Sequence, residues 1–187
     1  MKKYSLKIVQ DSAPDSPREW DNLTTIFCFH KRYNLGDKHD YKSDMFGGWE
    51  EFKEHIIAEY KPRMIKPLYM YDHSGITIST SAFGCQFDSG QVGWVFITDE
   101  RIKTLCGDME MDNDRLDRII EGEVETYDQY IQGEVYGYQI IETEICDKCH
   151  THEEVVDSCY GYFGEENAQE AGNEALCGYE EKVLQTT

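Results

Sequence analysis

The stretch Gln91-Val-Gly-Trp-Val-Phe-Ile-Thr98 is a dense run of β-branched and aromatic residues. A short continuous apolar run of this kind is typical of a strand that is buried on both faces, whereas a half-exposed strand alternates apolar and polar residues. We therefore predict a strand over residues 91–98 and place it at the centre of a sheet.

Other strands are predicted on both sides of this one, from shorter runs of β-branched, aromatic or alternating residues. They cover Tyr4–Gln10 (an edge strand), Leu23–His30, Met64–Tyr71, Ile76–Thr80, Val135–Ile145 and Glu154–Phe163. Apolar residues at helical spacing predict helices over Trp49–Tyr60 and Asp112–Ile131, and an acidic helix is expected over Glu165–Leu176. Because strands and helices do not alternate regularly, we expect an α+β fold, with a mainly antiparallel sheet packed with two to three helices.

The length of 187 residues predicts a single domain over residues 1–187. No apolar run approaches the ~18 residues that a membrane span needs. The start of the chain, MKKYSLKIVQDS, lacks the apolar core and cleavage site of a signal peptide. We therefore expect no membrane partner and a cytoplasmic location, where the seven cysteines would be reduced thiols.

Acidic residues are concentrated in the second half of the chain. Residues 101–187 carry 22 Asp/Glu against 6 Lys/Arg, which is about −16 of the formal net charge of −19. Such one-sided charge destabilises a compact state by self-repulsion, and it can attract a cationic surface or imitate a phosphate backbone. The alternative is a charge that only keeps the protein dispersed.

Direct binding of bare nucleic acid is disfavoured by this charge. One basic cluster could still support it, because Lys31, Arg32, Lys38 and Lys42 lie in one loop-like stretch, with Arg18 upstream. The alternative is ordinary solvated charge.

Tyrosines and carboxylates are interleaved in the long predicted helix and just after it. Tyrosine is enriched at protein interfaces, so an acidic, tyrosine-rich face would suit a basic partner groove. The residues expected to contact such a partner are Glu121, Glu125, Asp128, Tyr130 and Glu134. The alternative is that the aromatic residues belong to the core beneath an amphipathic helix.

A cysteine-rich turn is the sharpest local motif. Cys146 and Cys149 have the C-x2-C spacing of half a zinc site, and His152 (or His150) with Cys159 could complete four ligands. The second half lacks a recognised spacing, so a hairpin tip over residues 146–159 with incidental Cys and His, or a redox pair, remains open. No other cofactor is expected.

Two further groupings suggest catalysis. Cys28 and His30 would share one face of a strand, as a nucleophile and its base must. Asp72-His73-Ser74-Gly75 offers an acid, an imidazole and a hydroxyl, although Asp-x-x-Gly between strands is also ordinary hairpin sequence. A core role for Cys28 and a turn role for residues 72–75 are the alternatives.

Several strings in the chain are similar to those of a family of small acidic proteins of bacteriophages and other mobile elements. They are DSPREWDN (15–22), CFHKRYNLGD (28–37), YDHSG (71–75), DSGQVGWVF (88–96), EVETYDQYIQGEVYGY (123–138) and DSCYGYFG (157–164). The resemblance implies an origin in a mobile element, where disarming a host defence is a common role, and it implies anti-CRISPR inhibition of Cas9 in the host cytoplasm as the leading expectation. It transfers no catalytic residues.

Charge and resemblance together predict an inhibitor of a host nucleic-acid-binding defence effector, with Cas9 as the leading candidate. It would compete with DNA or RNA through its acidic surface. The alternatives are a small hydrolase or nuclease that uses His73, His30 and Cys28, and an adaptor protein of phage replication.

Overall fold

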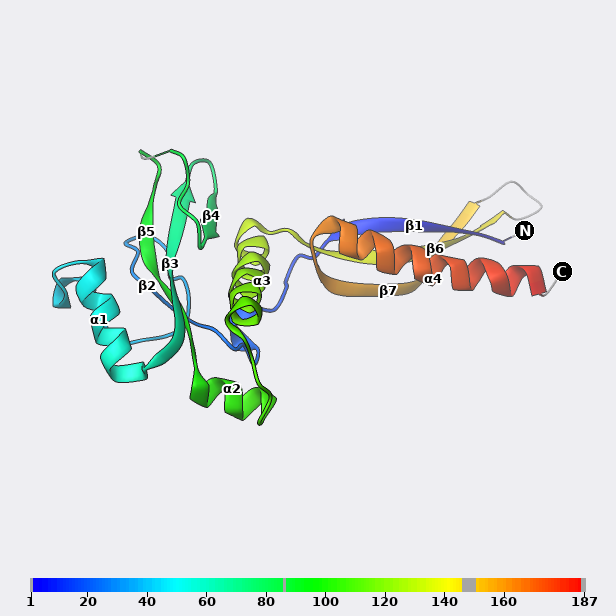
Figure 1. Cartoon of the computed structure of the whole chain (residues 1–187). Helices are drawn as coiled ribbons and strands as arrows, with labels where there is room; N and C mark the ends of the chain where they lie inside the picture. The colour runs from blue at the N-terminus through cyan, green and yellow to red at the C-terminus, as the bar shows by residue number, and fades with distance from the viewer. Residues whose placement is uncertain (1, 86, 146–150, 186–187) are drawn as a thin grey trace. The chain divides into compact units, whose positions relative to one another are not determined.

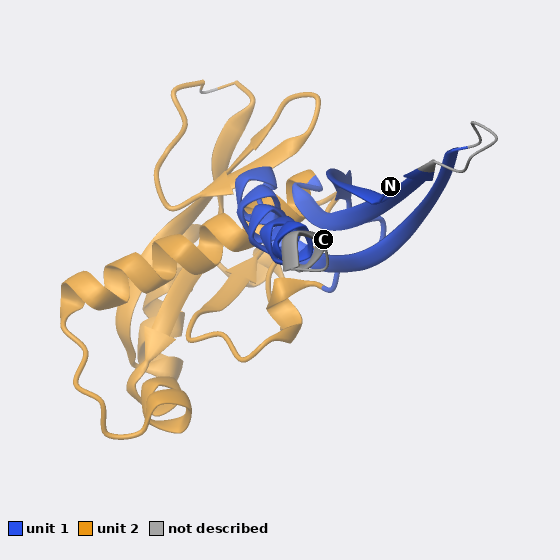
Figure 2. Cartoon of the chain, turned by 90° about the vertical axis from the view of Figure 1, so that its right-hand side faces the viewer, with its two compact units in different colours: residues 1–15, 133–187 blue, residues 16–132 orange. Residues whose placement is uncertain are grey.

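A computed structural model describes residues 2–85, 87–145 and 151–185. The chain forms two compact units, which Figure 2 shows in different colours. Unit 1 comprises residues 1–15 and 133–187, and unit 2 comprises residues 16–132. Whether residues 1–187 fold as one domain stays a prediction. No helix in the described part of the chain is long and apolar enough to cross a membrane.

Unit 2 is built on a four-stranded antiparallel sheet with the strand order β2-β5-β3-β4. Its strands are β2 (Thr25–Cys28), β3 (Pro62–Asp72), β4 (Ile76–Ser79) and β5 (Ser89–Thr98). β5 pairs with β2 on one side and with β3 on the other, so the predicted central strand is confirmed. Its side chains are buried in succession from Val92 to Ile97, as expected for a strand covered on both faces.

Helices cover both faces of this sheet (Figure 1). On one face α3 (Asn113–Gln132) packs its apolar stripe against Val95 and Ile97, and on the other α1 (Trp49–Tyr60) packs against Trp94 and Phe96. A third helix, α2 (Asp99–Cys106), follows β5 directly. Its first turn is capped by Thr98, whose hydroxyl accepts a hydrogen bond from the Arg101 N–H.

Unit 1 is a three-stranded antiparallel sheet with one helix on one face (Figure 1). The strand order is β1-β6-β7, with β1 at Lys2–Gln10, β6 at Val135–Ile145 and β7 at Thr151–Phe163. The helix α4 (Glu165–Gln185) lies close to the sheet because Gly172 has no side chain: a Cβ there would be 2.5 Å from Leu6 Cδ1. Farther along α4, the ring of Tyr179 contacts that of Tyr4, with centroids 5.2 Å apart.

The α+β prediction is confirmed, but the strands form two sheets rather than one, and the described residues form four α-helices rather than two to three. Three predicted elements differ in length. α4 extends beyond Leu176, because Tyr179 continues its packed face. β2 is shorter than residues 23–30, and residues 151–159 of the predicted hairpin tip belong to the strand β7, whereas residues 146–150 lie outside the described residues.

The β3–β4 turn is confirmed over residues 72–75, but the positive φ angle belongs to Ser74 (57°) and not to Gly75. The His73 N–H donates to the Gly75 carbonyl at 3.0 Å and closes the turn. Residues 72–75 therefore form a hairpin turn, as the structural alternative for this motif predicted.

Candidate functional site

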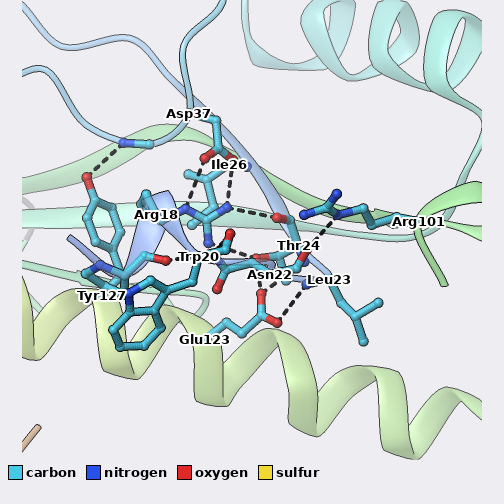
Figure 3. Close-up of polar contacts among 12 residues, drawn as sticks. Arg18, Trp20, Asn22, Leu23, Thr24, Ile26, Asp37, Arg101, Glu123 and Tyr127 are labelled. Carbon is cyan, nitrogen blue, oxygen red and sulfur yellow. Dashed lines mark hydrogen bonds and ion pairs between the residues drawn. The ribbon is translucent and has the colours of Figure 1, made fainter. Parts of the chain in front are cut away.

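A buried ion pair organises the chain segment around β2 (Figure 3). The Arg18 guanidinium is 7% exposed and donates to both carboxylate oxygens of Asp37, at 3.1 Å and 2.7 Å. Asp37 also accepts from the Ile26 N–H at 2.7 Å, and Arg18 donates to the Thr24 carbonyl at 2.8 Å. Arg18 thereby holds the chain that precedes β2, and Asp37 holds the loop that follows β2 to the strand itself.

Two side chains of α3 complete this network (Figure 3). Glu123 accepts from the backbone N–H groups of Leu23 and Thr24, both at 2.9 Å. The Tyr127 hydroxyl accepts from the Gly36 N–H at 2.9 Å. Residues of the strings 15–22, 28–37 and 123–138 therefore contact one another in a single hydrogen-bond network. These residues stabilise the fold of unit 2 and do not form an exposed surface.

The loop that follows β2 borders a solvent-open cavity of about 910 Å³ in unit 2. Cationic side chains of the loop and aromatic rings both contribute to its wall. The cationic ones are Lys31, Arg32, Lys38 and Lys42, and the rings include Phe29, Tyr33, Tyr41 and Trp49. The basic cluster that the sequence indicated therefore lines a concave surface.

A smaller hollow of about 360 Å³ shares His30, Arg32 and Val92 with this cavity. It also contains two carboxylates, Asp72 and Asp88. Arg32 forms an ion pair with Asp72, while His73 Nδ1 lies 3.3 Å from Asp88 Oδ2. The two carboxylates are thus each beside a basic side chain.

The predicted Cys28–His30 pair does not form a catalytic dyad. Burial raises the pKa of the Cys28 thiol to about 12, so the thiol stays protonated and is a poor nucleophile. Its side chain belongs to the core cluster beneath α3. His30 lies beyond the end of β2, and its Nδ1 accepts from the N–H groups of Arg32 and Tyr33, both at 3.3 Å. Cys28 is therefore a core residue.

The five residues predicted to contact a partner differ in how far the fold itself uses them. Asp128 accepts from Thr77 Oγ1 at 2.8 Å and from the Ile78 N–H at 2.7 Å, so it joins α3 to β4. Tyr130 packs against the core, and Glu121 lies 3.3 Å from Lys66.

The other two residues of that set differ from each other. Glu125 is exposed on α3 in unit 2, whereas Glu134 is exposed in unit 1. Much of the acid in α3 is therefore used within the fold, and the predicted partner-contact set stays a prediction.

A row of exposed acidic residues in unit 1 lies on α4. This helix packs Ala168 and Gly172 against the sheet, and its exposed side carries six glutamates. They are Glu165, Glu166, Glu170, Glu174, Glu180 and Glu181. Among the described residues, no ion pair involves any of the six.

The sequence-based prediction missed this face because it followed the tyrosine-rich stretch of α3. The available signal was the spacing of Glu166, Glu170 and Glu174, four residues apart and out of phase with Ala168 and Gly172. Positions four apart lie on one face of a helix, so this pattern predicts an acidic ridge.

The predicted zinc ligands are not brought together as a set. Cys146 and Cys149 lie outside the described residues. His152 and Cys159 both belong to β7, where they pair with Glu144 and Tyr138 respectively. Seven residues of extended strand separate them by roughly 23 Å, so they cannot bind the same ion. In the described part of the chain, no group of three or more His, Cys, Asp or Glu is placed to hold a metal.

Comparison with family models, curated proteins and solved structures found no match for this chain.

Proposed function

We propose that this protein inhibits a host nucleic-acid-binding defence effector, with Cas9 as the leading candidate. The acidic face of α4 occupies the cationic channel of the effector and competes there with DNA or RNA. The setting is the cytoplasm of a bacterium that carries the phage or mobile element, as the family resemblance implies.

The observation that carries this proposal is the row of exposed glutamates on α4. Between Glu165 and Glu181 the helix rises about 24 Å, so its six exposed glutamates present about one charge per 4 Å. One strand of DNA carries one charge per ~3.4 Å of helix axis. The two charge densities are close enough for a groove that accepts a phosphate backbone to accept this helix.

The charge of α4 works against the stability of the helix. Glu166, Glu170 and Glu174 form two like-charge pairs at four-residue spacing, and each such pair destabilises a helix by about 0.2–0.5 kcal/mol. The fold does not compensate them with an ion pair among the described residues. A surface that repels itself but can be neutralised by a cationic partner supports a role in binding.

Replacing Glu166, Glu170 and Glu174 by Gln is expected to slow association with the effector about tenfold, since electrostatic steering governs the encounter rate. The measurement is surface plasmon resonance with guide-loaded Cas9, together with inhibition of target-DNA binding. The matched control replaces three exposed glutamates of unit 2 by Gln, at Glu54, Glu59 and Glu100, and should leave association within about twofold.

Two results would contradict the proposal. Absence of binding to Cas9, both guide-loaded and guide-free, removes Cas9 as the partner. Inhibition that survives both the α4 triple variant and a rise in salt removes the mimicry mechanism, because competition by charge must weaken as ions screen it.

The same triple variant is expected to be more stable than the natural chain. Removal of the two repulsive pairs should raise the free energy of unfolding by about 0.4–1 kcal/mol at low salt, and the gain should shrink at high salt. Thermal unfolding followed by circular dichroism at two ionic strengths measures this. A variant that binds less and unfolds at a lower temperature would instead indicate damage to the fold.

A further inference from the structure

We propose that the cavity of unit 2 is a nucleotide-binding site, in which the lysines of the 31–42 loop hold the phosphate and the aromatic wall holds the base. The proposal goes beyond the inhibitory function, which uses α4 of unit 1. It rests on the charge, the ring geometry, the hydrogen-bonding groups and the size of the cavity.

The cavity is lined by positively charged side chains, although the chain as a whole is strongly acidic. The protein has 37 acidic residues and 18 basic ones, yet three exposed lysines, Lys31, Lys38 and Lys42, line one hollow. None of the three takes part in an ion pair among the described residues. Cations that line a concave wall concentrate positive potential there, which favours a compact anion such as a phosphate group.

Flat rings form the apolar part of the wall. Phe29 and Trp49 lie nearly parallel, with centroids 6.0 Å apart and planes 24° apart. Trp49 is half-buried, and its carbonyl accepts from the Trp94 indole N–H at 3.1 Å, which fixes the start of α1 beside the cavity. His30 and Tyr33 form a second stacked pair, with centroids 5.0 Å apart. Aromatic faces next to cations are the combination that binds a base and its phosphate.

His30 adds a hydrogen-bonding group to the wall. His30 Nδ1 is an acceptor for two backbone N–H groups, so the proton of the neutral ring is on Nε2, a donor. Burial and the nearby Arg32 charge lower the pKa of His30, which keeps this ring neutral at physiological pH.

In His39 it is Nε2, not Nδ1, that is hydrogen-bonded to the backbone. Its Nε2 donates to the Cys28 carbonyl at 3.0 Å, and its buried Nδ1 is an acceptor without a hydrogen-bond partner among the described residues. The cavity is thus offered an imidazole N–H donor by His30, one of the groups that the edge of a base pairs with, while the unsatisfied Nδ1 of His39 is buried from solvent.

The size of the cavity favours a single nucleotide over a strand. Small-molecule sites typically have volumes of about 300–1,000 Å³, and this one measures about 910 Å³. A longer polyanion would also be repelled by the net charge of −19. The chemistry therefore points to a nucleoside phosphate.

The test is a titration of the full-length protein with ATP, GTP and dTMP, by isothermal calorimetry and by the fluorescence of Trp49, with inorganic phosphate and an eight-residue oligothymidylate as further probes. We expect saturable binding of at least one nucleotide, weaker binding of phosphate alone, and no gain in affinity for the oligonucleotide over dTMP.

Two variants make the test specific. Replacing Lys31, Lys38 and Lys42 together by Gln is expected to weaken nucleotide binding by roughly tenfold for each charged hydrogen bond to phosphate that is removed. The matched control replaces Lys3, Lys7 and Lys61 by Gln, three exposed lysines that do not line the cavity, and should bind as the natural chain does. The variant Trp49→Leu should weaken nucleotide binding while leaving phosphate binding unchanged.

Three outcomes would overturn the proposal. They are no saturable binding of any of the three nucleotides, equal weakening by the cavity and control triple variants, and tighter binding of the oligonucleotide than of dTMP. Inhibition of the effector by the cavity triple variant is expected to be unchanged, so failure of the nucleotide site and failure of the α4 mechanism can be distinguished.

Discussion

An alanine in place of Gly93 is expected to destabilise unit 2 strongly. Gly93 lies in the middle of β5, opposite Cys28 of β2 and Leu68 of β3. A Cβ at this position would be 2.1 Å from the Phe27 carbonyl oxygen and 3.0 Å from the Cys28 Cα, both of which are backbone atoms. Since no side-chain rotation can relieve this clash, β2 must separate from β5, and we expect a loss of more than about 3 kcal/mol.

The same strand provides the control for this prediction. Gly90 is also in β5, and a Cβ there would have no neighbour within 4 Å. The variant Gly90→Ala should therefore unfold within about 1 kcal/mol of the natural chain. Urea unfolding followed by the fluorescence of the buried Trp94 compares the two variants. Equal stability of Gly93→Ala and Gly90→Ala would contradict the pairing of β2 with β5.

Removal of the Asp37 carboxylate is expected to destabilise unit 2 by about 3–5 kcal/mol, because it leaves the buried guanidinium of Arg18 without its counter-charge. Asp37→Ala also leaves the Ile26 N–H without its acceptor. The loop that borders the cavity is fastened by this carboxylate, so nucleotide binding should weaken together with stability.

An exposed ion pair serves as the comparison. Asp21 lies 3.7 Å from Arg101, and its side chain is 87% exposed. Asp21→Ala also removes a carboxylate from an arginine, but it should cost less than about 1 kcal/mol since both groups keep their water. Thermal unfolding of the two variants measures the difference. Similar losses would mean that Arg18 is not buried in solution.

The spacing of apolar residues predicted a helix or strand correctly where one face of that element packs against the core. The helix predicted from the spacing of the apolar residues between Trp49 and Tyr60 is present as α1, and the strand β5 was placed at the centre of its sheet. The division into two sheets was not predicted, because strand pairing between Lys2–Gln10 and Val135–Ile145 leaves no local signal in either segment. α2 was missed because its eight residues are too short to show a period.

The candidate sites were predicted less well, for a physical reason. The sequence does not distinguish a carboxylate that faces solvent from one that accepts backbone hydrogen bonds. Glu123 and Asp128 both accept backbone hydrogen bonds in the structure. The acidic character of residues 101–187 was visible, but its location on α4 depends on which helix face the sheet covers. Similarly, the basic cluster at 31–42 lines a cavity because the fold places Trp49, Gln91 and Val92 beside it, and the sequence assigned Trp49 to the apolar side of a helix.

The topology of unit 1 has a consequence for synthesis on the ribosome. β1 ends at Gln10, but β6, with which it pairs, begins only at Val135. Residues 16–132 are therefore translated while β1 has no strand to pair with. The charged side chains of Lys3 and Lys7 oppose the association of this unpaired strand with other chains during that interval. The helix α4, which carries the row of glutamates, follows β6 and β7 in the chain and is therefore synthesised after all three strands of its sheet.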